Sequence, residues 1–230
     1  MGSTRLPGKA LLLLHGRPVI VRIWERLCLA KELDTIVVAC PDTPENEVIE
    51  AVCTREGIGC VRGSEKDLAW RLLKVVEHTS ADALLRVTAD CPLVDPAGVD
   101  FLVHTWRIRD GRPDYFSNCF PKRTFPDGLD LELLTAETVR ILWGVPAPEA
   151  LTTYIWEHPH LFRHGLIEHV PDLGHLRWTL DTPEDLAFIR AIWNELPDGF
   201  GIEDVLALGR SPRSRWGFAS PGWGPDRWPS

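Results

Sequence analysis

Residues 83–95 read Ala-Leu-Leu-Arg-Val-Thr-Ala-Asp-Cys-Pro-Leu-Val-Asp, and this stretch decides the class of fold. Its first five residues are apolar apart from Arg86, and they predict a short buried strand that ends before Asp90. A helix is expected from about Pro96, because Asp95 can cap it and proline is favoured in the first helical turn. The predicted order is therefore strand, turn and helix.

The same order recurs along the first half of the chain. Residues 35–40, Thr-Ile-Val-Val-Ala-Cys, predict a second buried strand, and residues 58–61 predict a third. Apolar residues at helical spacing follow each of them, at 48–53 and at 68–76. Strands that alternate with helices of this length favour an α/β fold whose mostly parallel sheet is covered on both faces.

The second half of the chain changes character. Residues 112–175 carry short strand-like pieces separated by Gly, Pro and Asp, and we expect a small β-rich insertion there. Residues 166–170 and 176–180 are expected to form paired strands. We predict a single domain over residues 1–209, followed over residues 210–230 by an irregular tail rich in Ser, Pro, Gly and Trp.

The composition is that of an ordinary globular protein. The 230 residues are 44% hydrophobic and 25% charged, with a formal net charge of −8. A chain this acidic is a poor candidate for non-specific binding to nucleic acid or to anionic membranes, because both need a basic surface. The longest apolar run in the first half, residues 10–14, is too short to span a bilayer, and no signal-peptide cleavage pattern follows it. We therefore expect a cytoplasmic protein with no nucleic-acid partner and no membrane partner.

The first candidate site is the N-terminal stretch Met-Gly-Ser-Thr-Arg-Leu-Pro-Gly-Lys at residues 1–9. Its small residues allow backbone N–H groups to turn toward a ligand, and Arg5 and Lys9 add two cations. A nest of backbone amides with two cations suits a triphosphate. The alternative interpretation is a frayed terminus with solvated charges.

Two aspartates could hold a metal ion. Asp90 follows a buried strand, and ligands of open α/β sheets lie at the carboxyl ends of strands. Mg²⁺ often takes only one or two protein carboxylates together with substrate phosphates. Asp181 precedes Thr182, the expected N-cap of a helix, so its own side chain is available to complete a two-carboxylate site with Asp90. The alternative role for Asp90 is a helix cap.

Residues 125–132, Phe-Pro-Asp-Gly-Leu-Asp-Leu-Glu, surround a tight turn with carboxylates. These carboxylates belong to Asp127, Asp130 and Glu132. They are compatible with the acidic metal motif of a glycosyltransferase, or with a plain turn into a strand. Arg123, shortly before the turn, could meet a substrate carboxylate or could be solvated, so Arg123 and Asp127 are candidate substrate-binding residues.

These motifs closely resemble those of the sugar-acid cytidylyltransferases, the family of CMP-acylneuraminate and CMP-ketodeoxyoctonate synthetases, and most of all its spore-coat polysaccharide biosynthesis subgroup. The similarity covers residues 1–195, and it is carried in the family's order by residues 2–9, 35–39, 62–65, 86–95, 125–132 and 177–186. It implies a Rossmann-like nucleotidyltransferase domain. It also implies a homodimer that transfers CMP from CTP to a hydroxyl group of a sugar acid and releases pyrophosphate.

The resemblance also implies roles for individual residues. Arg5 and Lys9 correspond to the cations that hold the triphosphate and the leaving pyrophosphate, while Asp90 and Asp181 correspond to ligands of Mg²⁺. Arg5, Lys9 and Asp90 are therefore the expected catalytic residues. The expected nucleotide-binding residues are Gly2, Ser3, Thr4, Arg5, Lys9, Arg62, Gly63 and Ser64.

The sequence departs from the family pattern in two places. The family has a buried strand before the Met-Gly-Ser-Thr-Arg motif, whereas Met1 stands at that junction here. We therefore expect the first strand to be missing and a gap to separate the strands at residues 36–39 and 84–87. A histidine that relatives often carry before the Thr-x-Tyr-Ile helix is also absent from residues 148–154. The alternatives to CMP transfer are a glycosyltransferase that uses a nucleotide sugar and a catalytically silent, nucleotide-binding relative.

Overall fold

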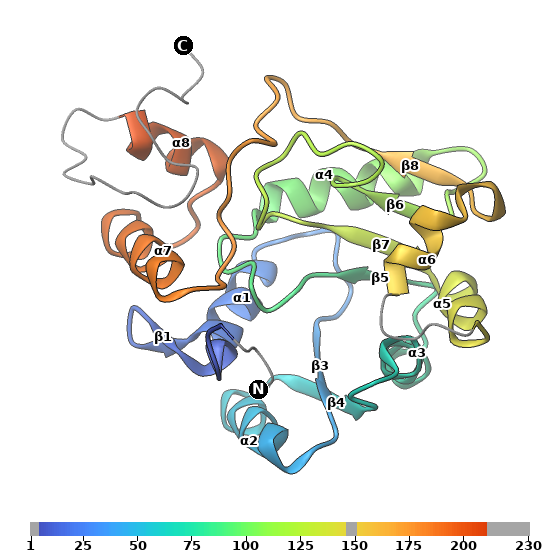
Figure 1. Ribbon diagram of the computed structural model, residues 1–230, viewed down its shortest axis with the longest axis horizontal. Helices are drawn as coiled ribbons and strands as arrows, with labels where there is room; N and C mark the ends of the chain where they lie inside the picture. Colours follow the sequence, from blue (N-terminus) through green and yellow to red (C-terminus); the bar gives the residue numbers. More distant parts are fainter. Residues whose placement is uncertain (1–4, 146–150, 211–230) are drawn as a thin grey trace.

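The computed structural model describes residues 5–145 and 151–210, and its helices flank two separate sheets and a small hairpin (Figure 1). Three of the expected nucleotide-binding residues, Gly2, Ser3 and Thr4, lie outside the described residues. Residues 211–230 of the expected tail also lie outside them.

The helices of the described residues are α1 (Val19–Leu27), α2 (Glu47–Glu56), α3 (Leu68–Thr79), α4 (Pro96–Ile108), α5 (Ala136–Trp143), α6 (Leu151–Glu157), α7 (Pro183–Glu195) and α8 (Ile202–Arg210). Short 3-10 helices are η1 (Lys9–Leu11), η2 (Pro44–Asn46) and η3 (Pro159–Leu161). The strands are β1 (Leu13–Leu14), β2 (Arg17–Pro18), β3 (Val37–Pro41), β4 (Gly59–Gly63), β5 (Ala83–Arg86), β6 (Tyr115–Ser117), β7 (Glu132–Thr135) and β8 (His164–Leu166).

The first sheet is the strand–helix–strand unit that the sequence predicts. Strands β3 and β4 pair in parallel, with Val37 opposite Gly59. The helix between them, α2, ends at Gly57, whose φ of 69° belongs to the left-handed region that glycine adopts without strain. Apolar residues of α2, among them Ile49 and Val52, are buried against β3. The sequence pattern and the packing agree here because all of these contacts are local.

The second sheet is mixed rather than mostly parallel. Its strand order is β5-β7-β6-β8, in which β7 runs antiparallel to both of its neighbours and only β6 and β8 pair in parallel. The connection between β6 and β7 contains a tight turn, in which the Leu129 N–H donates to the Pro126 carbonyl at 3.1 Å and Gly128 has a φ of 108°. Residues 112–175 therefore contribute three strands to the sheet that holds β5. The register places Arg86, the last residue of β5, opposite Glu132, the first residue of β7.

Strands β3 and β5 do not pair with each other in the described part of the chain (Figure 1). A cavity of about 590 Å³ is lined by both strands, with Val37 on one side and Leu84 and Leu85 on the other. The expected gap between these two strands is therefore present.

Residues 166–170 and 176–180 do not form the expected strand pair. Strand β8 ends at Leu166 and pairs with β6, while residues 176–180 run as an extended segment with a single bridge between Arg177 and Asp127. Trp178 and Leu180 in this segment are completely buried. The apolar pattern that predicted a strand thus reflects real burial, but the segment's backbone pairs with the loop before β7.

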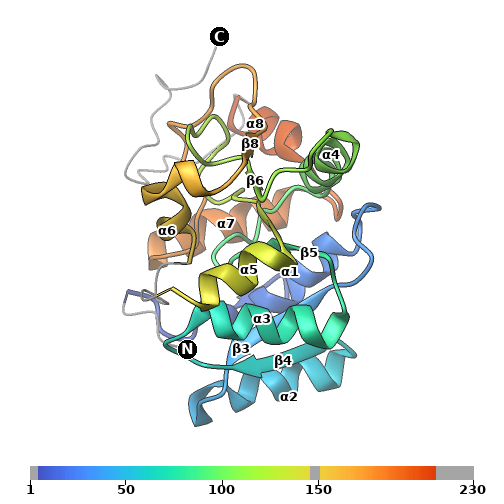
Figure 2. The same ribbon diagram turned by 90° about the vertical axis from the view of Figure 1, so that its right-hand side faces the viewer.

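Helices α3 and α5 lie side by side in both views (Figure 1, Figure 2). Leu72 and Leu73 of α3 and Val139 of α5 pack with Leu134 of β7 in one core cluster. A larger cluster joins α4 and α7 to the other face of β7, through residues such as Leu133. Strand β7 is thus held on both faces, which fixes the place of Glu132 at its start.

Candidate active site

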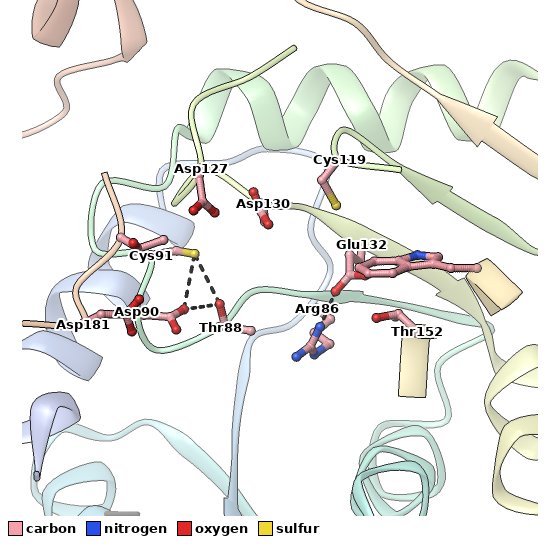
Figure 3. Close-up of a pocket in the computed structure, with 12 residues that line it drawn as sticks. Arg86, Thr88, Asp90, Cys91, Cys119, Asp127, Asp130, Glu132, Thr152 and Asp181 are labelled. Carbon is pink, nitrogen blue, oxygen red and sulfur yellow. Dashed lines mark hydrogen bonds and ion pairs between the residues drawn. The ribbon is translucent and has the colours of Figure 1, made fainter. Parts of the chain in front are cut away.

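A cavity of about 340 Å³ lies beyond the carboxyl end of β5 (Figure 3), and we call it the acidic cavity. The acidic side chains that line it are Asp90, Asp127, Asp130, Glu132 and Asp181. The other lining residues are Arg86, Thr88, Cys91, Cys119, Thr152, Trp156 and Thr179. Candidate residues from three separate stretches of the sequence therefore meet in one cavity.

Asp90 is held in the loop that follows β5. Thr88 donates its hydroxyl hydrogen to one carboxylate oxygen of Asp90, and the Cys91 Sγ lies 3.6 Å from the same oxygen. The Asp90 carbonyl accepts a hydrogen bond of 2.9 Å from the Leu180 N–H, which ties this loop to the segment before α7. Asp90 and Asp181 consequently lie at the same end of the acidic cavity (Figure 3).

Lys9 lies between Asp90 and Asp181. Its Nζ donates hydrogen bonds to Asp90 Oδ2 and to Asp181 Oδ1, both at 3.0 Å. Arg5, which is mostly exposed, places its Nη2 3.2 Å from the other Asp181 oxygen. Two carboxylates from distant parts of the chain therefore share one ammonium group, with a second cation beside them. We call the part of the cavity lined by Asp90 and Asp181, together with the adjacent Lys9 and Arg5, the Lys9 end.

The pKa values of Lys9 and Asp181 are shifted by their charged neighbours. Burial acts to lower the pKa of Lys9, but the carboxylates of Asp90 and Asp181 outweigh it, so this pKa is raised. Burial acts to raise the pKa of Asp181, but Lys9 and Arg177 outweigh it, so this pKa is lowered. Both groups are therefore charged throughout the neutral pH range.

The start of α7 positions Asp181. Thr182 and Asp185 form a capping box, in which Thr182 Oγ1 accepts from the Asp185 N–H at 3.3 Å and Asp185 accepts from the Thr182 N–H at 2.8 Å. Asp185, 3% exposed, also accepts from the Asp181 N–H at 2.9 Å and from Arg177 Nη1 at 2.6 Å. The prediction that Thr182 caps the helix and leaves Asp181 outside the cap is confirmed.

The residues present at the Lys9 end fit a divalent cation such as Mg²⁺. Asp90 and Asp181 both reach one positive group, the Lys9 ammonium, so a metal ion could be shared by the same two carboxylates. Within the described ranges there is no cluster of three or more His, Cys, Asp or Glu side chains suited to a metal. A metal here would therefore complete its shell with water and ligand oxygens, as Mg²⁺ does at phosphate sites.

Asp127 and Asp130 form a further part of the lining. Arg123 does not line the cavity: its Nη2 donates to Asp130 Oδ2 at 2.8 Å, its Nη1 bonds the other Asp130 oxygen, and its Nη1 lies 3.5 Å from Asp127. The Asp127 backbone is fixed, because its carbonyl accepts from the Trp178 N–H at 2.6 Å. Burial, with Asp130 nearby, raises the pKa of Asp127. Arg123 thus braces the carboxylates instead of facing the cavity.

The opposite end of the cavity combines charge with aromatic rings, and we call it the Trp156 end. Arg86 Nη1 forms an ion pair with Glu132, and the Tyr115 hydroxyl donates to Glu132 Oε1 at 2.8 Å. The Trp156 Nε1–H donates to the Tyr115 oxygen at 3.3 Å. Burial and the adjacent Glu132 raise the pKa of Tyr115, so its hydroxyl keeps the proton that it donates. Thr152 lies beside this group (Figure 3).

The expected nucleotide-binding residues at the end of β4 do not line the acidic cavity. Arg62 is tied to helix α2 and the loop before it, through Glu50 at 2.9 Å and the Thr43 carbonyl at 3.2 Å. The Ser64 hydroxyl accepts from the Asp67 N–H at 3.0 Å. Gly63 lies so close to Arg71 that a Cβ would stand 3.0 Å from the Arg71 Cα. Their role in binding nucleotide remains a prediction.

Sequence reasoning missed most of the Trp156 end. Arg86 belongs to a predicted strand, Thr152 to the Thr-x-Tyr-Ile helix, and Trp156 to no motif, so the sequence pattern assigns none of them to the site. The signal that could have found Arg86 is an arginine in an otherwise apolar strand, since a buried charge needs a partner. Nothing local to Trp156 predicts its place, because its neighbours Phe120 and Tyr115 are remote in the sequence.

Known proteins resemble this chain in sequence and in fold. The profile of a family described as cytidylyltransferase matches residues 1–142. The spore coat polysaccharide biosynthesis protein SpsF of Bacillus subtilis (strain 168) is 30% identical over 227 residues, which cover 92% of each chain. The 8-amino-3,8-dideoxy-manno-octulosonate cytidylyltransferase of Shewanella amazonensis is 30% identical over 111 residues, which cover 48% of this chain and 45% of that protein.

Solved structures show the same relationship. A cytidylyltransferase from Leptospira borgpetersenii, 30% identical, superimposes with a TM-score of 0.85 over 90% of this chain and 89% of that one. The CMP:2-keto-3-deoxy-manno-octonic acid synthetase complexed with CTP, 19% identical, shares the fold with a TM-score of 0.63 over 84% and 95% of the two chains. The fold is thus that of the Rossmann-like nucleotidyltransferases, as the sequence predicted. Within that class, this chain belongs to the cytidylyltransferase family.

No helix in the described part of the chain has the length and apolar character needed to cross a membrane.

Proposed function

We propose that this cytidylyltransferase uses Mg²⁺ to transfer CMP from CTP to a hydroxyl group of a sugar acid, and that it releases pyrophosphate. The observation that carries the proposal is Lys9 held between Asp90 and Asp181, with Arg5 beside them. Two cations and two carboxylates at one point suit a triphosphate together with the metal ion that accompanies it.

In this reaction the acceptor hydroxyl oxygen attacks the α-phosphorus of CTP, its proton passes to water, and the bond from that phosphorus to the oxygen bridging to the β-phosphorus breaks, so that pyrophosphate leaves. Negative charge then accumulates on the leaving pyrophosphate, where Lys9 and Arg5 neutralise it. Lys9 is already charged and oriented by two carboxylates, so little reorganisation accompanies the step. A Mg²⁺ ion held by Asp90 and Asp181 would neutralise further phosphate charge.

The thiols of the cavity support direct transfer without a covalent intermediate. Burial, with Asp130 nearby, raises the pKa of Cys119 to about 12. Burial and the adjacent Asp90 raise the pKa of Cys91 further still. Both thiols therefore stay protonated near neutral pH, and a protonated thiol is a weak nucleophile. Such a site is suited to catalysis by positioning of the reactants and by charge neutralisation.

The names of the relatives support a sugar acid as the acceptor. The Shewanella protein is named for an amino-dideoxy-octulosonate, other relatives for 3-deoxy-manno-octulosonate, and the Bacillus protein for spore coat polysaccharide. We propose that this chain likewise serves surface polysaccharide biosynthesis, as a homodimer in the cytoplasm. Sedimentation velocity at micromolar concentration tests the dimer, and a monomer under those conditions contradicts it.

Pyrophosphate release tests the proposed reaction. The purified chain is incubated with CTP, Mg²⁺ and a panel that includes 3-deoxy-manno-octulosonate, its 8-amino-8-deoxy derivative and an acylneuraminate. Release that depends on both CTP and one of the acceptors is the expected result. Release of a nucleoside phosphate from a nucleotide sugar instead supports the glycosyltransferase alternative, and CTP binding without turnover supports the silent relative.

A further inference from the structure

The two ends of the acidic cavity present different chemistry to a ligand. Asp90 and Asp181 lie at one end, and Arg86, Glu132 and Thr152 lie at the other (Figure 3). If the triphosphate binds at the Lys9 end, an acceptor that attacks its α-phosphorus must place one hydroxyl there. The rest of the acceptor then extends along the cavity toward the Trp156 end.

Trp156 is a large aromatic side chain that lines this cavity and remains 37% exposed. Phe120 covers one face of its indole, with ring centroids 5.2 Å apart and planes inclined by 9°. The Nε1–H is used by the Tyr115 hydroxyl at 3.3 Å. The ring is thus fixed by a stacking contact and by a hydrogen bond, and its exposed surface, beside the cavity that it lines, is open to a ligand.

The side chains around Trp156 indicate what kind of ligand suits the exposed surface of its ring. Tyr115 connects Trp156 to Glu132, and Glu132 holds Arg86, whose side chain is 25% exposed. Thr152 adds a hydroxyl. A ligand that matches this set has a flat surface of C–H bonds for the indole and several hydroxyl groups for the polar neighbours. A monosaccharide ring has both, whereas an open-chain polyol phosphate lacks the rigid apolar face.

We propose that Trp156 is the platform on which the sugar ring of the acceptor stacks, and that it makes the enzyme specific for a cyclic carbohydrate acceptor. This inference rests on the proposed CMP transfer and names a residue that determines its acceptor. Tyr115 and Phe120 act as positioning residues, since they hold the indole and do not themselves line the cavity.

The test compares Trp156→Ala and Trp156→Phe with Trp143→Ala. Trp143 is a matched control, because it is also an exposed tryptophan in contact with a second aromatic ring, Trp70 at 5.3 Å, yet it lies outside the cavity lining. We expect Trp156→Ala to raise the KM for the sugar acid by about tenfold while Trp156→Phe restores most of it, as loss and recovery of a stacking contact predict. The Kd for CTP should stay within about twofold in all three variants.

An unchanged acceptor KM in Trp156→Ala overturns the inference, and so does an equal change in Trp143→Ala. If CTP is turned over with no member of the panel, the proposed reaction fails, and saturation-transfer NMR then tests Trp156 separately. A panel of free hexoses, hexuronic acids and octulosonates is mixed with the wild type and with Trp156→Ala. Binding by the wild type that is lost in the variant supports the platform. Binding by neither protein, or by both equally, overturns it.

Discussion

The Lys9 end and the Trp156 end belong to the same cavity but hold their charges in different ways. At the Lys9 end, Asp181 is contacted by Lys9, Arg5 and Arg177, and Lys9 also reaches Asp90. At the Trp156 end, Glu132 is paired with Arg86 and buried beside Tyr115 and its aromatic neighbours. The first end gathers cationic side chains around two carboxylates, and the second places an aromatic ring beside a buried ion pair.

This difference separates two tasks of a group-transfer enzyme. Charged groups that neutralise a leaving group act in the transition state, so their loss lowers the rate of the chemical step. A rigid surface that holds the acceptor acts mainly on binding, so its loss raises KM. Substitutions at the two ends should therefore change different kinetic constants.

The largest effect is expected at Asp90. Asp90→Asn removes the carboxylate that shares Lys9 and would hold Mg²⁺, so turnover should fall by about 10³-fold. The melting temperature should hardly change, because the substitution keeps the shape of the side chain. Initial rates of pyrophosphate release and thermal unfolding measure the two quantities. Asp34→Asn is the control, since the Asp34 side chain is 91% exposed and does not line the acidic cavity. A fully active Asp90→Asn variant would contradict the assignment of Asp90 as a catalytic residue.

A second effect is expected where α7 begins. Asp185→Asn removes a buried charge that Arg177 and two backbone N–H groups contact, so the free energy of unfolding should fall by about 3 kcal/mol. Urea unfolding measures it, with the exposed Glu184→Gln as control. Because Asp185 positions Asp181, turnover should fall while the acceptor KM stays the same. A raised acceptor KM would show that the two ends are not independent.

A smaller effect is expected at Tyr115, which belongs to the Trp156 end. Tyr115→Phe removes the hydroxyl that connects Trp156 with Glu132, and the acceptor KM should rise about fivefold, as expected for one hydrogen bond of about 1 kcal/mol. The kcat and the Kd for CTP should not change. Tyr154→Phe, at the other tyrosine of the chain, is the control. A fall in kcat instead of a rise in KM would mean that Tyr115 acts on the chemical step.

The smallest effect concerns pH. Lys9 and Arg177 overcome burial and hold the pKa of Asp181 below its usual 3.8, so in the folded state this carboxylate binds a proton less readily than in the unfolded chain. Its contribution to stability is therefore complete above pH 3.8 and is lost as the pH falls below that value. Urea unfolding between pH 6 and pH 3 should show a weaker loss in Asp181→Asn than in the wild type. Identical profiles would contradict the lowered pKa.

Several parts of the fold and site could be predicted because they depend on neighbours in the sequence. The unit of β3, α2 and β4 follows from apolar periodicity and from glycine at the helix end. The start of α7 follows from the capping residues Thr182 and Asp185. That cap leaves the Asp181 side chain outside the helix, and for this reason the sequence indicates Asp181 as a candidate metal ligand.

Other parts could not be predicted. Residues 176–180 have the apolar pattern of a strand, but their backbone hydrogen bonds go to the loop at Asp127. Strand β7 runs antiparallel to both of its neighbours in a sheet that was expected to be mostly parallel. In each case the partner is chosen by packing between segments that the sequence pattern does not relate.

The alternation of strands and helices, the cap of α7 and the kinds of charged residue at the strand ends can all be read from the sequence. Each of these depends on hydrogen bonds and burial within a few residues along the chain. The position of Lys9 between Asp90 and Asp181, and that of Trp156 on Phe120 at the other end of the same cavity, emerge only when the chain is folded. Contacts between residues so far apart are set by how whole elements pack, and that is a property of the assembled fold.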